Sequence, residues 1–281
     1  MRLARRLGGG GGAALIVAVV LAFLALPVVA LITYQPLHSL FHDFGTKVAT
    51  DAILVSLKCN AIAFGVMIAL GTPFAYVLAR HRFPGRTLLI TIVELPLVMP
   101  PAVAGLGLLV AFGRFGLLGG TLNALGIQLG FTQAAVVLAV LFVAAPFYLR
   151  FAIAAFEGID HTLLDVAGTL GAGPIRRFFK VAIPLAGGGL GAAAGVAFAR
   201  GMGEFGATIL FAGSFQGTTQ TMALAVYALF AANLDQAIAI GVELIIVSAV
   251  ILISTKLLFA YWNASTSTSS SRGERSISAP A

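Results

Sequence analysis

The sequence predicts an all-α transmembrane protein with about six spanning helices. Its mean hydropathy is +1.03, and 59% of its residues are hydrophobic while only 10% are charged; soluble domains carry about 25% charged residues. Its apolar segments are long enough to cross roughly 30 Å of hydrocarbon as helices. They are also continuous and rich in Ala, Leu, Val and Ile, whereas the strands of a membrane β-barrel are short and alternate. These observations exclude a soluble fold.

The apolar segments divide into six predicted spans. The first has Arg2, Arg5 and Arg6 before it, as a signal peptide would. Its apolar run is longer than the roughly 7–15 residues of a signal peptide, however, so we expect a retained helix. The predicted spans are 13–34, 49–79, 87–112, 133–156, 185–212 and 236–262.

The Lys and Arg residues predict that both termini are cytoplasmic, because cytoplasmic loops are enriched in these residues. Six spans place thirteen of the 17 basic residues on one side, and the opposite loops hold only Lys47 and Arg114. The net charge of +7 therefore reflects a multi-pass protein of the cytoplasmic membrane, and no nucleic-acid partner is expected. The thirteen are Arg2, Arg5, Arg6, Arg80, Arg82, Arg86, Arg150, Arg176, Arg177, Lys180, Lys256, Arg272 and Arg275.

Three parts are expected along the chain. Residues 1–50 hold a short lead-in, the first helix and an outer loop, and residues 51–262 hold the core spans. Residues 263–281 are rich in serine and cannot bury a core, so a disordered tail is predicted. Cys59 is the only cysteine, which leaves no disulfide or cysteine-based metal site within one chain. No metal or cofactor is expected.

The longest predicted cytoplasmic loop, residues 157–184, has the pattern of two short helices joined by a tight turn. Apolar residues recur at helical spacing between 160 and 170. Gly171 can adopt the left-handed backbone that ends many helices, and Pro174 suits the first position of a second helix. A basic helix that only anchors the loop at the membrane surface would have a similar composition. The second helix carries Arg176, Arg177 and Lys180, beside Phe178 and Phe179, which are expected to face lipid or neighbouring spans.

The spacing within this loop resembles the cytoplasmic signature of ABC-importer permeases. That signature is Glu-Ala-Ala, three residues, Gly, nine residues and Ile-x-Leu-Pro. Here Asp165-Val-Ala is followed by Gly171 and then by Val181-Ala-Ile-Pro184, with no gap in the spacing. The glycine and proline match, and the replaced residues keep charge or bulk. The residues to which the resemblance gives an ATPase-coupling role are Asp165, Ala167, Gly171, Pro174, Arg176, Arg177 and Pro184.

This resemblance implies a type I permease fold for residues 51–262, with a short coupling helix seated in a cleft of an ATP-hydrolysing subunit. The chain has no Gly-x-x-x-x-Gly-Lys-Ser/Thr phosphate loop and no βαβ nucleotide fold. ATP is therefore expected to bind a partner, a dimer of cytoplasmic ATPase subunits, and the chain is not expected to be an enzyme.

Charged residues inside the predicted spans are candidates for the translocation path or its gate. Arg200 and Glu204 lie four residues apart, as on one helix face. A charge at this depth must be paired or face an aqueous cavity. An ion pair that only fixes helix packing is the alternative to a role in transport, and the two are compatible. Thr208 follows in the same segment and is a further candidate.

The third span is predicted to kink or break, because Pro96, Pro100 and Pro101 remove backbone donors. Broken backbone within a membrane occurs where it is buried in protein or lines a cavity. Glu94, Pro100 and Pro101 therefore join the candidates, although a purely structural kink would have the same sequence. Lys58 could pair with Glu94 or extend toward the membrane surface. The role of Glu243, in the sixth predicted span, is not assigned by the sequence either.

The segments Gly203-Glu-Phe-Gly-Ala-Thr208, Thr219-Gln-Thr and Leu224-Ala-Val-Tyr227 resemble those of molybdate and tungstate permeases. The related sulfate permeases more often have Tyr and Ser in the glutamate segment, and a sulfate or thiosulfate importer is the alternative. The resemblance covers roughly residues 50–260. It implies a homodimer in the lipid bilayer, with a solute-binding protein docking on the outer loops, at 35–48, 114–132 and 219–231.

Two other classes remain open. An ion-coupled secondary transporter would use Glu94, Glu204 and Glu243 as titrating sites. A membrane-embedded enzyme is the second, but the four histidines lack metal-ligand spacing such as His-Glu-x-x-His.

Overall fold

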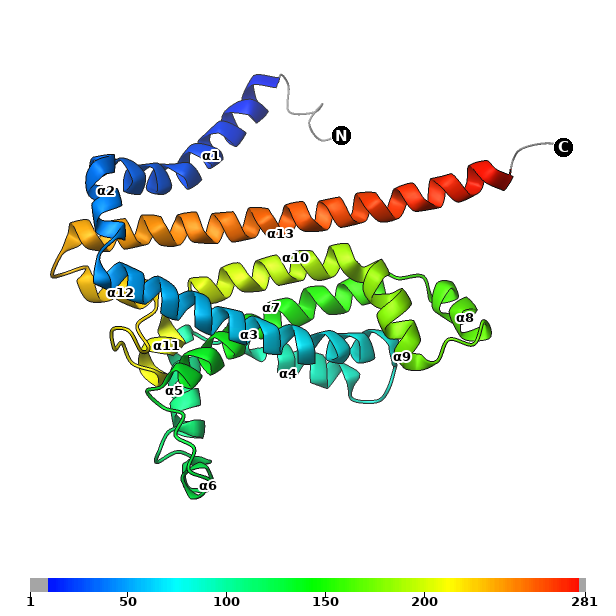
Figure 1. Cartoon of the computed structure of the whole chain (residues 1–281), viewed down its shortest axis with the longest axis horizontal. Coiled ribbons are helices and arrows are strands. Elements are labelled where there is room, and N and C mark those ends of the chain that lie inside the picture. The colour runs from blue at the N-terminus through cyan, green and yellow to red at the C-terminus, as the bar shows by residue number, and fades with distance from the viewer. Residues whose placement is uncertain (1–9, 278–281) are drawn as a thin grey trace.

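The computed structural model describes residues 10–277, and every regular element within this range is a helix. Arg2, Arg5 and Arg6 of the charge pattern lie outside the described residues. The elements in Figure 1 are α1 (Gly10–Thr33), α2 (Leu37–Phe44), α3 (Lys47–Arg80), α4 (Arg86–Val98), α5 (Pro101–Phe112), α6 (Gly119–Ala124), α7 (Gln133–Glu157), α8 (His161–Thr169), α9 (Pro174–Arg177), the π-helical turn η1 (Phe178–Ala182), α10 (Ile183–Met202), α11 (Gly206–Phe211), α12 (Met222–Leu229) and α13 (Leu234–Ile277).

The helices of the described chain confirm the prediction of about six spans. Five helical segments are long and apolar enough to cross a membrane, and α4 with α5 makes a sixth if this bent pair counts as one span. α4 and α5 meet at an angle of 114°. The predicted break in the third span therefore falls at Met99 and Pro100, and Pro101 begins α5 as its first residue.

α3, α7 and α10 form the centre of the bundle (Figure 1). Tyr148 and Phe156 of α7 are almost fully buried, and the Tyr148 hydroxyl lies 2.7 Å from the Thr72 hydroxyl of α3. Small residues allow close approach of these helices: a Cβ atom on Gly201 would lie 2.6 Å from the Asn60 side-chain oxygen. The glycines of α10 thus serve helix packing.

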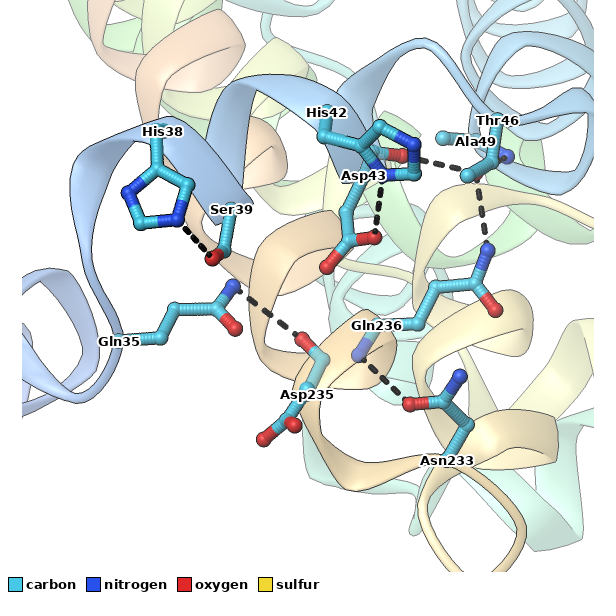
Figure 2. A network of polar contacts seen from close by, with 10 residues as sticks. All are labelled: Gln35, His38, Ser39, His42, Asp43, Thr46, Ala49, Asn233, Asp235 and Gln236. Carbon is cyan, nitrogen blue, oxygen red and sulfur yellow. Dashed lines mark hydrogen bonds and ion pairs between the residues drawn. The ribbon is translucent and has the colours of Figure 1, made fainter.

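α1 stands apart from this core and contacts the bundle through α13 (Figure 1). Almost all of its apolar side chains are exposed, as suits a helix surrounded by lipid. Figure 2 shows how the segment after α1 is fastened. The Gln35 amide donates to the Asp235 carbonyl at 3.4 Å, and the Gln236 amide donates to the Thr46 hydroxyl at 2.9 Å.

One boundary prediction was wrong. The fifth span was predicted to reach residue 212, but α10 ends at Met202 and residues 206–211 form the separate helix α11. The side chain of Glu204, two residues before α11, accepts a hydrogen bond from Ala207 N in the first turn of that helix. α13 is described as far as Ile277, and residues 278–281 lie outside the described residues, so the disordered tail expected at 263–281 stays a prediction.

Candidate functional site

The loop between α7 and α10 has the predicted architecture of helix, turn and helix. The Asp160 carboxylate caps α8 by accepting a hydrogen bond from Thr162 N at 2.9 Å, which lowers the pKa of this carboxyl. Gly171 ends the turn with φ of +83°, in the region that glycine adopts without strain. Pro174 is the first residue of α9, as predicted. α8 and α9 lie together at one end of the molecule (Figure 1).

The outer surface of this loop carries exposed apolar side chains. Leu170 and Ile175 are 82% and 76% exposed. Asp165 and Arg176 are also exposed, so a charged rim accompanies the apolar side chains. An exposed apolar patch with a polar rim is typical of a protein interaction site. We call this patch the docking surface, and its apolar members are Leu163, Val166, Leu170, Ile175 and Phe179.

The inner side of the loop packs on the bundle. The Phe178 ring lies 4.9 Å from the Tyr76 ring and 6.3 Å from the Phe156 ring, measured between centroids, so Phe178 faces neighbouring spans as predicted. Phe179, for which the same was predicted, is 59% exposed on the outer side of the loop. Arg177 is half-buried and covers Gly168, where a Cβ atom would lie 3.2 Å from the Arg177 Nη1 atom. Ala167 and Pro184 are partly buried beside them. Sequence reasoning missed Gly168, whose small size lets α8 accept this guanidinium.

Arg200 and Glu204 form an ion pair, with Nη2 and Oε2 2.8 Å apart. The Glu204 side chain is 1% exposed, whereas that of Arg200 is 29% exposed. Glu204 lies beyond the end of α10, so the pair does not share one helix face as predicted. The other carboxylate oxygen of Glu204, Oε1, accepts a hydrogen bond from Ala207 N at 2.8 Å, which connects the ion pair to α11. Thr208 is fully buried, and its hydroxyl has no hydrogen-bond partner among the described residues.

α11 fits against α5 at two glycines. A Cβ atom on Gly105 would lie 2.6 Å from the Ala207 carbonyl oxygen. One on Gly206 would lie 2.6 Å from the Cβ atom of Pro101. The structure therefore brings together three predicted residues, Pro101, Glu204 and Thr208, from segments about a hundred residues apart. Pro100 precedes α5 and is exposed.

Glu94 belongs to a different part of the molecule. It lies 3.8 Å from Arg150, with both side chains partly exposed, and so links α4 to α7. Lys58 does not pair with Glu94 but donates to the Gln133 side chain at 2.8 Å. One carboxylate oxygen of Glu243 is buried without a hydrogen-bond partner among the described residues. Within residues 10–277, no three His, Cys, Asp or Glu side chains are grouped closely enough to hold a metal ion.

Comparisons with known proteins confirm the resemblance that the loop signature carries. Residues 61–267 match the family model described as binding-protein-dependent transport system inner membrane component. The molybdenum transport system permease protein ModB of Mycobacterium bovis is 40% identical over 238 residues, which are 83% of this chain and 88% of the relative. The Escherichia coli protein of the same name is 42% identical over 180 residues, 64% of this chain and 79% of that protein.

Solved structures share the fold. A chain from a bacterial alginate ABC transporter has a TM-score of 0.67 at 16% identity, and the match covers 86% of this chain and 91% of the other. A chain from the MetNI methionine ABC transporter has a TM-score of 0.58 at 18% identity and covers 76% of this chain and 96% of the other. The likeness extends over nearly the whole of both solved chains, so the all-helical permease fold predicted from the sequence is confirmed.

Proposed function

The chain belongs to the family of binding-protein-dependent transport system inner membrane components, and from this premise we propose that it is the permease subunit of an ATP-driven importer of molybdate or tungstate. The assignment of the substrate rests on the sequence identity of about 40% to molybdenum transport permeases over most of the chain. The glutamate segment that resembles molybdate permeases is the one that forms the buried Arg200–Glu204 pair and α11.

The docking surface is the proposed seat of the ATPase partner. It combines exposed apolar residues with Asp165 and Arg176, whereas its inner side is held on the bundle by Phe178. A dimer of ATPase subunits would bind two such surfaces, one from each copy of the chain. ATP binding would draw the two copies' loops together and open the pathway outward. ATP then acts only in the partner, and the chain has no ATPase site or cofactor of its own.

The membrane arrangement follows from the same assignment. The docking surface lies in the cytoplasm, and α13 runs toward that end of the molecule (Figure 1). Both termini of the chain are then cytoplasmic, in a multi-pass protein of the cytoplasmic membrane. A solute-binding protein would dock at the opposite end, on the outer loops.

The candidate gate lies where α5 meets α11. Glu204 is paired with Arg200, so an entering anion does not meet an uncompensated buried carboxylate. Pro100 and Pro101 set the break that turns α5 toward this contact, and Thr208 supplies a buried hydroxyl. Glu94, held by Arg150, is the proposed inner part of the same route.

Oxyanion competition tests the substrate. Vesicles that contain the whole complex and are loaded with ATP should import molybdate, and excess tungstate should compete while excess sulfate should not. Uptake is measured with radiolabelled molybdate. Competition by sulfate alone would assign the chain to a sulfate importer, and uptake that an uncoupler abolishes while ATP is maintained would assign it to a secondary transporter.

Leu170→Asp tests the docking surface. Leu170 is 82% exposed, so the change should leave the fold intact but place a charge in the apolar contact. We expect binding of the ATPase subunit to weaken by about tenfold or more, as for a central interface residue. The measurement is the amount of ATPase that copurifies with the chain.

Leu117→Asp is the matched control, because Leu117 is 86% exposed and lies in the distant segment between α5 and α6. That variant should retain the ATPase subunit. Equal retention by both variants would refute the docking surface.

A further inference from the structure

Arg86 connects the ends of three helices. It is the first residue of α4, and its Nε atom donates to the Leu78 carbonyl in the last turn of α3 at 2.7 Å. Its Nη2 atom donates to the carboxylate of Glu157, the last residue of α7. The Arg86 side chain is 25% exposed and that of Glu157 is 47% exposed, so the pair is partly shielded from solvent.

The electrostatics at the C-terminal ends of α3 and α7 favour an arginine. The last carbonyls of a helix have no intrahelical partner and carry partial negative charge. Leu78 supplies one such carbonyl, and Glu157 adds a full negative charge at the end of α7. The planar guanidinium can donate to both acceptors at once, which a lysine ammonium on its flexible stem does less well.

Arg80 makes a second connection at the same end of the molecule. Its Nη1 and Nη2 atoms both lie 3.4 Å from the carbonyl oxygen of Ile159, in the link between α7 and α8. Its Nη1 atom also lies 3.1 Å from His161 Nδ1. Because arginine can only donate, this histidine nitrogen is the acceptor. His161 is the first residue of α8, so the end of α3 is joined directly to the start of α8.

We propose that Arg80 and Arg86, with Glu157 and His161, form an arginine clamp that makes α8 and the N-terminal end of α4 move together. Both arginines hold the segment 157–161, through which the docking surface leaves α7. α4 begins at Arg86, carries Glu94 and leads to the break before α5. A displacement of α8 by the partner is thereby passed to the broken span. This inference rests on the proposed function, because it assigns the clamp to coupling in an ATP-driven importer.

The clamp makes Arg86 a positioning residue, and the test measures coupling as well as folding. The purified complex with its ATPase and solute-binding partners is placed in vesicles, and import is divided by ATP hydrolysed. Arg86→Ala should keep the ATPase subunit and its hydrolysis but lower the amount imported per ATP by roughly three- to tenfold. Glu157→Gln should lower this ratio less, because it keeps a hydrogen-bond acceptor for the guanidinium.

Arg82→Ala is the matched control, since Arg82 lies in the link between α3 and α4, is exposed and makes no side-chain hydrogen bond or ion pair with any described residue. It should leave import per ATP unchanged. Arg86→Lys keeps the positive charge but cannot donate to Leu78 and Glu157 in the same planar geometry, so its import per ATP should lie between those of Arg86→Ala and the unmodified chain. If Arg86→Ala is not recovered from the membrane, the import per ATP of Arg86→Lys and Glu157→Gln tests the clamp instead.

An unchanged ratio in the recovered Arg86 and Glu157 variants would overturn the clamp. The failure of the proposed function would look different, because the unmodified complex would then import no oxyanion with ATP. A loss of the ATPase subunit from Arg86→Ala and Arg86→Lys alike would also overturn the clamp, since the arginine would then serve docking rather than coupling.

Discussion

Gly105→Ala should destabilise the protein markedly, while Gly107→Ala two residues away should not. A methyl group on Gly105 would lie 2.6 Å from the carbonyl oxygen of Ala207 and 2.7 Å from its Cα atom, so the backbone of α11 must shift. Overpacking of this kind costs about 1–3 kcal/mol. The shift would also disturb the hydrogen bond from Ala207 N to Glu204. The measurement is the apparent melting temperature of the purified chain in detergent.

Gly107 is a control within the same helix, because nothing lies within 4 Å of a Cβ atom there. Alanine should stabilise that position slightly, by up to about 1 kcal/mol, since it favours helix more than glycine does. The two variants should therefore move the melting temperature in opposite directions. A similar shift for both would mean that α5 and α11 do not depend on this close contact.

Arg200→Met should damage the protein more than the double change Arg200→Met with Glu204→Gln. The single change leaves the Glu204 carboxylate, which is 1% exposed, without its cationic partner. Breaking one side of a buried pair typically costs about 3–5 kcal/mol, whereas neutral replacement of both partners costs far less. Glutamine also retains an oxygen that can accept from Ala207 N, so α11 keeps its first hydrogen bond. The yield of folded protein and its melting temperature measure the difference.

Equal damage by the single and double changes would show that Arg200 and Glu204 do not stabilise the folded chain as a pair. Import by the double variant then separates the two roles of the pair. A double variant that folds but imports poorly places Arg200 and Glu204 in the transport route. One that folds and imports normally leaves them a structural role alone.

The spans and the docking loop could be predicted because their signals are local. Unbroken apolar runs define the long helices, and prolines at 100 and 101 locate the break between α4 and α5. Gly171 and Pro174 locate the turn, where the glycine does take the left-handed backbone. Each of these depends on a residue's own backbone preference or on its immediate neighbours.

The contacts between distant segments could not be predicted in the same way. Nothing near Glu204 in the sequence indicates that its carboxylate accepts a hydrogen bond from the first turn of α11, so the fifth span was extended too far. Gly105 and Gly206 have no local sequence signal that sets them apart, and their importance depends on the contact between α5 and α11. Arg86 was counted only as a topological signal, although its guanidinium connects Leu78 and Glu157. Such pairings depend on the way the helices meet.

The isolation of α1 has a consequence for how freely its sequence can change. Most of its side chains are exposed and do not fit against another helix of this chain, so we expect hydrophobicity to matter there more than shape. Exchanges among Leu, Ile, Val and Phe should be nearly neutral along most of its length. The end near Gln35, fastened to Asp235, is the exception. Among related chains we therefore expect α1 to drift fastest in sequence while keeping its length and its apolar character.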